Sequence, residues 1–424
     1  MKKTDLFKFL KSNPKFSKLW VSQLMSQITI NMINFVMATR IYEKTGSTLA
    51  VSFLWVFYYL PSIIFGPFSG FLVDLWGRRK ILYYTNFFQG LTVLLYLFIG
   101  EHLYPIYPII FLYSILNLLY GPAEAACIPW LVKKKSLSFA NSIFMLSSQS
   151  SLIVGFGISG VIMRLFGKDT PILISAGALF LAALSTYLLP KNEPKNHFKT
   201  QTLSNFFSQI KTGYLFIKDN KMVLFPILII AGFQIFLVVM GVTIPTVASK
   251  LFGIQVQDAG PLIIVPLGIG ALLGANLVSR YSGIRKKTFI EKGLLIGGLV
   301  FLMMTFVIPR LESYKTLFGF PLMILLGICS FFILVPNQTL LQENTPSSLR
   351  GRIFGALNFV STAATLPCLL FTASVVDLVG IKVFMFMAFL LIVSVFIFVK
   401  KRGQAIIASI TVNKDNGITN ATTI

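Results

Sequence analysis

Residues 70–80 read GFLVDLWGRRK and lie directly between two long apolar runs. This stretch carries one acidic residue, Asp74, and three basic residues, Arg78, Arg79 and Lys80. Four charges in such surroundings need a polar environment, and a short loop at the surface of a membrane provides one. The composition of the whole chain decides whether the flanking runs are membrane helices.

The composition is that of an integral membrane protein. The chain has 424 residues, of which 55% are hydrophobic and only 12% are charged, and its mean hydropathy is +0.79. A soluble domain could not bury so much apolar surface. The many glycines and prolines lie largely inside the apolar runs, which membrane helices tolerate because neighbouring helices satisfy the interrupted backbone. We therefore predict an all-α membrane protein.

The apolar runs predict twelve transmembrane helices, because each can cross a hydrocarbon core that takes roughly 20 residues. The first run follows Met1–Lys18, exceeds the length of a signal-peptide core and has no small-residue cleavage site, so we expect it to be retained. The expected spans are residues 18–40, 49–74, 80–100, 105–131, 138–166, 171–189, 222–249, 258–279, 289–309, 317–342, 353–377 and 382–400.

Charge asymmetry predicts the orientation of these helices. If both termini are cytoplasmic, most of the 37 Lys and Arg residues fall on the cytoplasmic side, as the positive-inside rule requires for a plasma-membrane protein. The net charge of +23 then follows from topology and from attraction to anionic lipid headgroups. Nucleic acid is excluded as a partner because the basic residues are scattered over many short loops.

The chain contains an internal repeat. Its glycine and proline positions recur between helices two and eight and between helices four and ten: Pro61, Gly66, Gly70 and Pro122 correspond to Pro266, Gly270, Gly274 and Pro336. We predict two pseudo-symmetric six-helix halves, 1–189 and 222–400, joined by a cytoplasmic linker, 190–221, with an amphipathic surface helix, and followed by a tail, 401–424. Duplicated halves are typical of alternating-access transporters, although glycine-rich helices can also produce such echoes by chance.

The loop signature resembles that of the major facilitator superfamily, which places a glycine, an acid, a second glycine and basic residues at these spacings. The matching residues are Gly70, Asp74, Gly77, Arg78, Arg79 and Lys80. The resemblance implies a charge cluster that latches the two halves in the outward-open state; the alternative is a merely positive inner loop. The second half carries a degraded copy, with Arg280 in the acid's place. The segments 122–132 and 345–355 resemble the macrolide-efflux branch of drug exporters.

Polar residues inside the spans are the candidates for a substrate cavity, since the bilayer disfavours them elsewhere. The alternative is that these side chains join helices to one another, at about 0.6 kcal/mol each. Four of them follow steps of four, four and three residues in the first span, which puts them on one helix face. The candidates are Gln23, Gln27, Asn31, Asn34, Asn117, Tyr120, Gln234, Asn337, Gln338 and Asn358.

Glu124 is the only acidic residue well inside an expected span. An unpaired carboxylate costs roughly 2.5 to 3.5 kcal/mol at the centre of a membrane helix, and protonation removes much of that cost. A carboxyl group whose charge depends on the direction in which the cavity faces can couple proton flow to transport. The rival hypotheses are a static hydrogen-bonded acid and an acid paired with a cationic substrate.

No pattern in the sequence predicts an enzyme, a cofactor or a metal site. The chain has no phosphate-binding loop, and its three cysteines lack CxxC spacing. We expect a monomeric, proton-coupled exporter of a drug-like or secreted small molecule. Gly155, Gly157 and Gly160 are similar to the antiporter motif of the superfamily's exporters, but the proline of that motif is missing. The alternatives are an importer of a neutral metabolite and a channel or membrane enzyme.

Overall fold

The computed structural model describes residues 3–100, 102–191, 221–281, 285–345 and 350–415, and this part of the chain is helical without any strand. The N-terminal half contains α1 (Lys3–Ser12), α2 (Pro14–Thr45), α3 (Thr48–Trp76), α4 (Arg78–Leu94), α5 (Ile106–Leu131), α6 (Leu137–Phe166) and α7 (Thr170–Tyr187). The C-terminal half contains α9 (Lys221–Thr246), α10 (Val265–Arg280), α11 (Lys286–Phe306), α12 (Lys315–Glu343), α13 (Arg350–Val379) and α14 (Ile381–Asp415).

Short helical segments extend several of these helices. They are η1 (Leu95–Phe98) after α4, the π-helical η3 (Val247–Phe252) after α9, and η4 (Val256–Asp258) and the π-helical η5 (Gly260–Ile264) before α10. The α14 helix continues to Asp415, well past the expected end of the last span at residue 400. The amphipathic helix expected in the linker lies outside the described residues.

Eleven helical segments of the described residues are long and apolar enough to cross a membrane, and each overlaps one of the expected spans, with ends that differ by up to eight residues. The predicted all-α membrane fold is confirmed. The remaining expected span, 18–40, lies inside α2, which the same criterion does not select. This helix has a low hydropathy because of the amides that the sequence places on one of its faces. It nevertheless belongs to the helix bundle, since it packs closely against α6 and α7.

Glycines with positive φ mark two of the sharp breaks between helices. Gly46 ends α2 with φ +62°, and its N–H donates to the Tyr42 carbonyl at 2.8 Å. Gly77 separates α3 from α4 with φ +83°. Residues with a Cβ rarely adopt this region, so a glycine at each position lets the chain turn without strain. The second glycine of the loop signature is thus required by the backbone itself.

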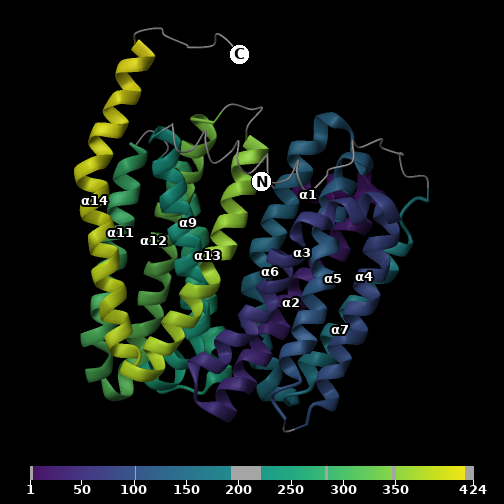
Figure 1. Cartoon of the computed structure of the whole chain (residues 1–424), viewed down its shortest axis with the longest axis horizontal. Coiled ribbons are helices and arrows are strands. Elements are labelled where there is room, and N and C mark those ends of the chain that lie inside the picture. Colours follow the sequence, from purple (N-terminus) through teal and green to yellow (C-terminus); the bar gives the residue numbers. More distant parts are fainter. Residues whose placement is uncertain (1–2, 101, 192–220, 282–284, 346–349, 416–424) are drawn as a thin grey trace.

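The two halves lie side by side and repeat one another's packing (Figure 1). The pairs α3/α5, α4/α7 and α2/α6 have as their counterparts α10/α12, α11/α14 and α9/α13, and each of these pairs is closely packed. One pair breaks the symmetry. In the N-terminal half α2 packs along α7, where the Thr29 hydroxyl donates to the Ser175 carbonyl at 3.4 Å, whereas the equivalent helices α9 and α14 make few contacts.

The start of α1 and the end of α14 lie at the same end of the molecule (Figure 1). We call this end the terminal face; it carries the α3–α4 turn at Gly77 and the ends of α11 and α12 at Lys286 and Glu343. The opposite end, the distal face, carries the α2–α3 turn at Gly46 and the α13–α14 turn at Gly380. The candidate site is defined relative to these two ends of the molecule.

Candidate transport pathway

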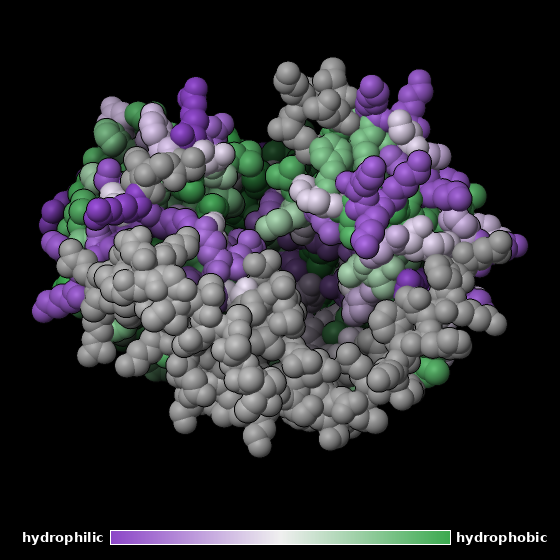
Figure 2. Space-filling model, turned by 90° about the horizontal axis from the view of Figure 1, so that it is seen from above, coloured by the Kyte–Doolittle hydropathy of each residue, from purple (hydrophilic) through white to green (hydrophobic). Residues whose placement is uncertain are grey.

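A hollow opens on the terminal face between the two halves. Figure 2 views the molecule from this face and shows the hollow bordered by both hydrophilic and hydrophobic residues. The two halves therefore separate at this end. The hydrogen bonds and ion pairs described between them lie at the distal end.

Asp377, near the end of α13, joins the halves at the distal end. Its carboxylate accepts hydrogen bonds from the Ser47 hydroxyl at 2.6 Å and from the backbone N–H groups of Thr48 and Leu49 at 2.8 and 2.9 Å. These donors form the first turn of α3, where the N–H groups lack partners within the helix. A carboxylate satisfies them and complements the positive end of the helix dipole. Asp377 thus caps a helix of the opposite half.

Further polar pairs surround this cap and also cross between the halves. The Thr48 and Thr246 hydroxyls lie 2.7 Å apart, and the Ser249 hydroxyl donates to the Tyr42 hydroxyl at 3.0 Å. The other two pairs are Gln257 with Glu43, at 3.2 Å, and Arg164 with Asp258, at 3.0 Å. The distal closure therefore consists of short-range contacts that separate once the halves move apart by a few ångströms.

A seam of glycines lets α6 approach the other half closely. A Cβ on Gly160 would collide with the Gln257 carbonyl oxygen, and one on Gly157 would come within 2.6 Å of the Val265 side chain. On the other side of the seam, a Cβ on Gly260 would collide with the backbone of α6. Two of the three glycines noted in the sequence thus pack against η4 and the η5–α10 segment. The third, Gly155, packs against α2.

The basic residues of the loop signature bind their own half in this conformation. The Arg78 side chain is buried and donates to the Ala126 carbonyl at 2.9 Å. Arg79 donates to the Tyr187 carbonyl, and its guanidinium lies 5.2 Å from the centre of the Tyr187 ring. Lys80 is exposed. These contacts hold α4 against α5 and α7. The surroundings of Gly70 and the side chain of Asp74 lie outside the described part of the structure, so the latch between the halves stays a prediction.

Polar side chains gather in the interior of the N-terminal half around Glu124. The Ser22 and Tyr120 hydroxyls lie 3.1 Å apart, and the Asn86 amide donates to the Ser22 hydroxyl at 3.0 Å. Glu124 lies one helical turn after Tyr120 on α5, and its Oε1 atom is buried without a hydrogen-bond partner. A buried acceptor that no protein group satisfies is suited to a proton, a water molecule or a ligand.

These observations agree with what the chain is similar to. A family model described as Major Facilitator Superfamily matches residues 19–367. This chain belongs to the Major Facilitator Superfamily. The members of this superfamily are transporters, so the chain is a transporter and not an enzyme. The family resemblance that the loop signature suggests is confirmed.

Individual relatives in the superfamily are distant. Macrolide efflux protein A of Streptococcus pyogenes is 23% identical over 377 residues, which cover 87% of this chain and 91% of that protein. The uncharacterized MFS-type transporter YfiS of Bacillus subtilis is 26% identical over 332 residues, which cover 78% and 79% of the two chains. The crystal structure of nucleoside transporter NupG matches with a TM-score of 0.68 at 12% identity, over 93% of this chain and 99% of that one. This likeness shows the shared fold alone.

The four polar residues that the sequence places on one face of α2 have different surroundings in the structure of this superfamily member. The Gln23 amide donates to the Phe144 carbonyl of α6 at 3.0 Å, and the Asn31 amide donates to the Gln27 carbonyl of its own helix at 2.8 Å. Asn34 is buried, and its Oδ1 atom has no partner. Gln23 therefore connects helices within one half, while Gln27 and Asn31 are only half-buried.

The remaining cavity candidates lie on α5, α9, α12 and α13. Asn117 donates to the Tyr58 hydroxyl at 3.3 Å, and the buried Asn337 amide donates to its own helix at 2.7 Å. Gln234 and Gln338 are half-buried, and the Asn358 side chain lies outside the described residues.

Sequence reasoning missed Asp377, Ser22 and Asn86. A signal for the latter two exists, since each is a polar side chain inside an expected span. Asp377 gives no such signal, because an acid at the end of a span looks like an ordinary surface charge.

Proposed function

We propose that this chain exports a drug-like or secreted small molecule from the cell in exchange for protons. The proposal takes the terminal face as cytoplasmic, following the distribution of Lys and Arg, and places the chain as a monomer in the plasma membrane. The structure then corresponds to an inward-open conformation, in which substrate enters the hollow from the cytoplasm. The similarity to macrolide efflux protein A supports export.

Transport requires the reverse arrangement, closed at the terminal face and open at the distal face. In that change the carboxylate of Asp377 leaves the first turn of α3. Water molecules then bind both the carboxylate and the N–H groups of that turn. The glycine seam between α6 and the η5–α10 segment opens at the same time. Asp74, Arg78 and Arg79 would then form the latch on the cytoplasmic side, as the family resemblance implies.

Glu124 is the proposed proton carrier, and its unpartnered Oε1 atom is the observation on which this proposal rests. While the acid is neutral, its interior position costs little, because no charge is desolvated. When a proton leaves toward the cytoplasm, the carboxylate needs water, a cation or a polar partner. The adjacent Tyr120–Ser22–Asn86 hydrogen bonds supply polar neighbours that can reorient. If the proton and the substrate occupy the pathway alternately, the inward flow of protons is coupled to the outward flow of substrate.

Aromatic side chains of α3 favour certain substrates. Trp55, Tyr58 and Tyr59 form an aromatic group on α3, with the Trp55 and Tyr59 rings stacked 6.2 Å apart. Aromatic faces of this kind suit a bulky amphipathic or weakly cationic molecule. In the middle of the described spans no Lys or Arg is placed to attract a strongly anionic substrate.

Dye efflux from energised vesicles at several imposed pH gradients tests this proposal. We expect Glu124→Gln to abolish the dependence of efflux on the gradient, because the amide cannot release a proton. The matched control is Glu291→Gln, since Glu291 is an acid at the terminal end of α11 that pairs with Lys287 at 3.4 Å. If Glu124→Gln retains the native proton dependence, the assigned role is wrong.

An importer of a neutral metabolite is the second candidate. Its support is limited to the shared fold with a nucleoside transporter. In cells that express the chain, export predicts lower accumulation of a dye or drug and greater resistance, and a protonophore should remove both effects. Import predicts greater uptake of a neutral solute with unchanged resistance.

A further inference from the structure

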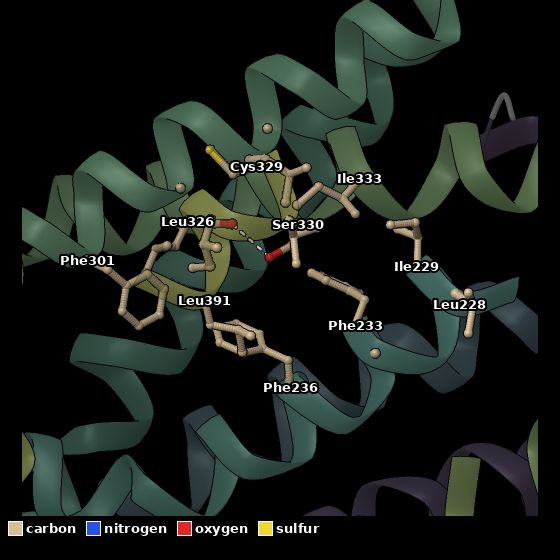
Figure 3. A pocket seen from close by; sticks show the side chains of 16 residues that line it. Leu228, Ile229, Phe233, Phe236, Phe301, Leu326, Cys329, Ser330, Ile333 and Leu391 are labelled. Atoms are coloured by element: carbon tan, nitrogen blue, oxygen red, sulfur yellow. Dashed lines mark hydrogen bonds between the residues drawn. The ribbon is translucent and has the colours of Figure 1, made fainter. Parts of the chain in front are cut away.

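A second cavity lies away from the hollow, inside the C-terminal half. It measures about 210 Å³ and is bounded by α9, α11, α12 and α14 (Figure 3). Among its described lining residues the only hydroxyl or amide side chain is Ser330, and that hydroxyl donates to the Leu326 carbonyl at 2.8 Å. The cavity therefore offers a ligand almost entirely hydrocarbon. Its lining includes Phe233, Phe236, Gly297, Phe301, Cys329 and Leu391.

The cavity exists because the two halves differ in one pair of helices. In the N-terminal half, α2 packs along α7, whereas the equivalent helices α9 and α14 make few contacts and the cavity lies between them. Leu228 of α9 and Leu391 of α14 border the cavity and are 56% and 57% exposed. On membrane helices such exposure faces lipid, so the cavity opens sideways toward the hydrocarbon core.

Basic side chains lie on α11 and α14, on the side of the cavity that is nearer the terminal face. They are Lys286, Lys287 and Lys292 of α11 and Lys400 and Lys401 of α14. Lys287 Nζ lies 3.4 Å from the Lys400 carbonyl oxygen, which shows that the start of α11 adjoins α14 at this level, well before α14 ends at Asp415.

Two acids, Glu343 and Glu291, pair with Lys286 and Lys287, so the described cluster retains an excess of positive charge. Lys292 adjoins Gly293 of the lining, and the other lysines lie one to two helical turns from the cavity. At 1.5 Å of rise per residue, Gly293 is about 10 Å along α11 from Lys286, and Val395 is about 8 Å along α14 from Lys400. A phosphate among these lysines and a hydrocarbon chain in the cavity are therefore within the reach of one phospholipid molecule.

We propose that this cavity binds an acyl chain of an anionic phospholipid whose phosphate lies among the lysines at the start of α11 and the neighbouring Lys400 and Lys401 of α14. An apolar cavity of about 150 Å³ stays dry and takes up molecules such as benzene, so a hydrocarbon chain is a fitting occupant. The lysines supply the charge complementarity that selects an anionic headgroup. The proposal depends neither on the direction of transport nor on its coupling.

Retention of defined lipids, measured by native mass spectrometry on the purified full chain, tests the proposal. We expect phosphatidylglycerol to survive delipidation better than phosphatidylcholine of the same chain length. Replacement of Lys287, Lys400 and Lys401 by alanine should reduce this preference by about fivefold for each lysine that contacts the headgroup.

Gly232 offers a way to fill the cavity without disturbing the packing. It lines the cavity, and a Cβ there would meet no atom within 4 Å. We expect Gly232→Leu to reduce the retention of phosphatidylglycerol. The control is Gly177→Leu in α7, where a Cβ also meets no atom within 4 Å, and it should retain the lipid as the native chain does.

Two results would overturn the proposal. Equal retention of phosphatidylglycerol and phosphatidylcholine, unchanged in the lysine variants, would mean that the cavity accepts any apolar chain. Native retention in Gly232→Leu would mean that the lipid binds elsewhere. The lysine variants change exposed or half-buried side chains, so they test the headgroup contact even if Gly232→Leu fails to fold.

Discussion

The distal and terminal ends of the molecule differ in the kinds of contact that their residues make. At the distal end, backbone groups meet backbone or carboxylate: Asp377 caps α3, and Gly160 lies against the Gln257 carbonyl. At the terminal end, Arg78 and Arg79 instead bond to carbonyls of their own half. Contacts made through backbone tolerate little change in side-chain size, whereas basic side chains can exchange partners. The distal closure therefore combines a close backbone fit with a carboxylate cap, whereas the proposed terminal closure depends on side chains that must change partners.

The largest effect is expected from Gly160→Ala, which removes the close fit of the distal seam. The added Cβ would collide with a backbone carbonyl, and backbone cannot move aside as a flexible side chain can. We expect the distal ends to separate and efflux to fall by about tenfold or more, since a penalty above about 1.4 kcal/mol changes an equilibrium tenfold. Spin labels at His102 and Lys382, both exposed on the distal face, would report the separation.

The matched control for this substitution is Gly177→Ala, because a Cβ at Gly177 has open space. It should leave both the label distance and efflux at native values. A native label distance in Gly160→Ala would show that the seam is not required for distal closure.

An intermediate effect is expected from Asp377→Asn. The amide keeps one acceptor oxygen but loses the charge that strengthens hydrogen bonds to the first turn of α3, and charged hydrogen bonds contribute about 1.5 to 3 kcal/mol each when shielded from water. Asp377 is exposed, so we expect a shift of about tenfold in the ratio of distal-closed to distal-open molecules. The control is Asp169→Asn, whose carboxylate pairs with Arg40 inside one half and should not affect that ratio.

The smallest effect is expected from Arg164→Gln. Arg164 pairs with Asp258 across the halves at 3.0 Å, but its side chain is 57% exposed, and exposed ion pairs contribute about 0 to 1 kcal/mol. We expect a change of less than about fivefold in the closed-to-open ratio, and 1 M salt should remove it by screening. A tenfold or larger change that salt leaves intact would assign this pair a role beyond a surface contact.

The sequence predicted the helical architecture because each span depends on local hydropathy. It also identified Glu124, since an acid in an apolar run is unusual wherever its neighbours lie. It could not identify Asp377, whose partner Ser47 lies 330 residues away and on the other half. The spacing of Gln23 and Asn31 predicted a shared helix face but not the helix that the face would meet. Local pattern therefore gives elements and unusual residues, while cross-half partners depend on tertiary placement.

The polar character of α2 has a consequence for the biogenesis of this transporter. This helix is synthesised before α6 and α7, yet its amides weaken its partitioning into lipid as an isolated segment. Its neighbours α6 and α7, which cover Gln23 and Thr29, are synthesised much later. Stable integration of α2 is therefore expected to await those helices, so that the N-terminal half inserts as a cooperative unit rather than one segment at a time.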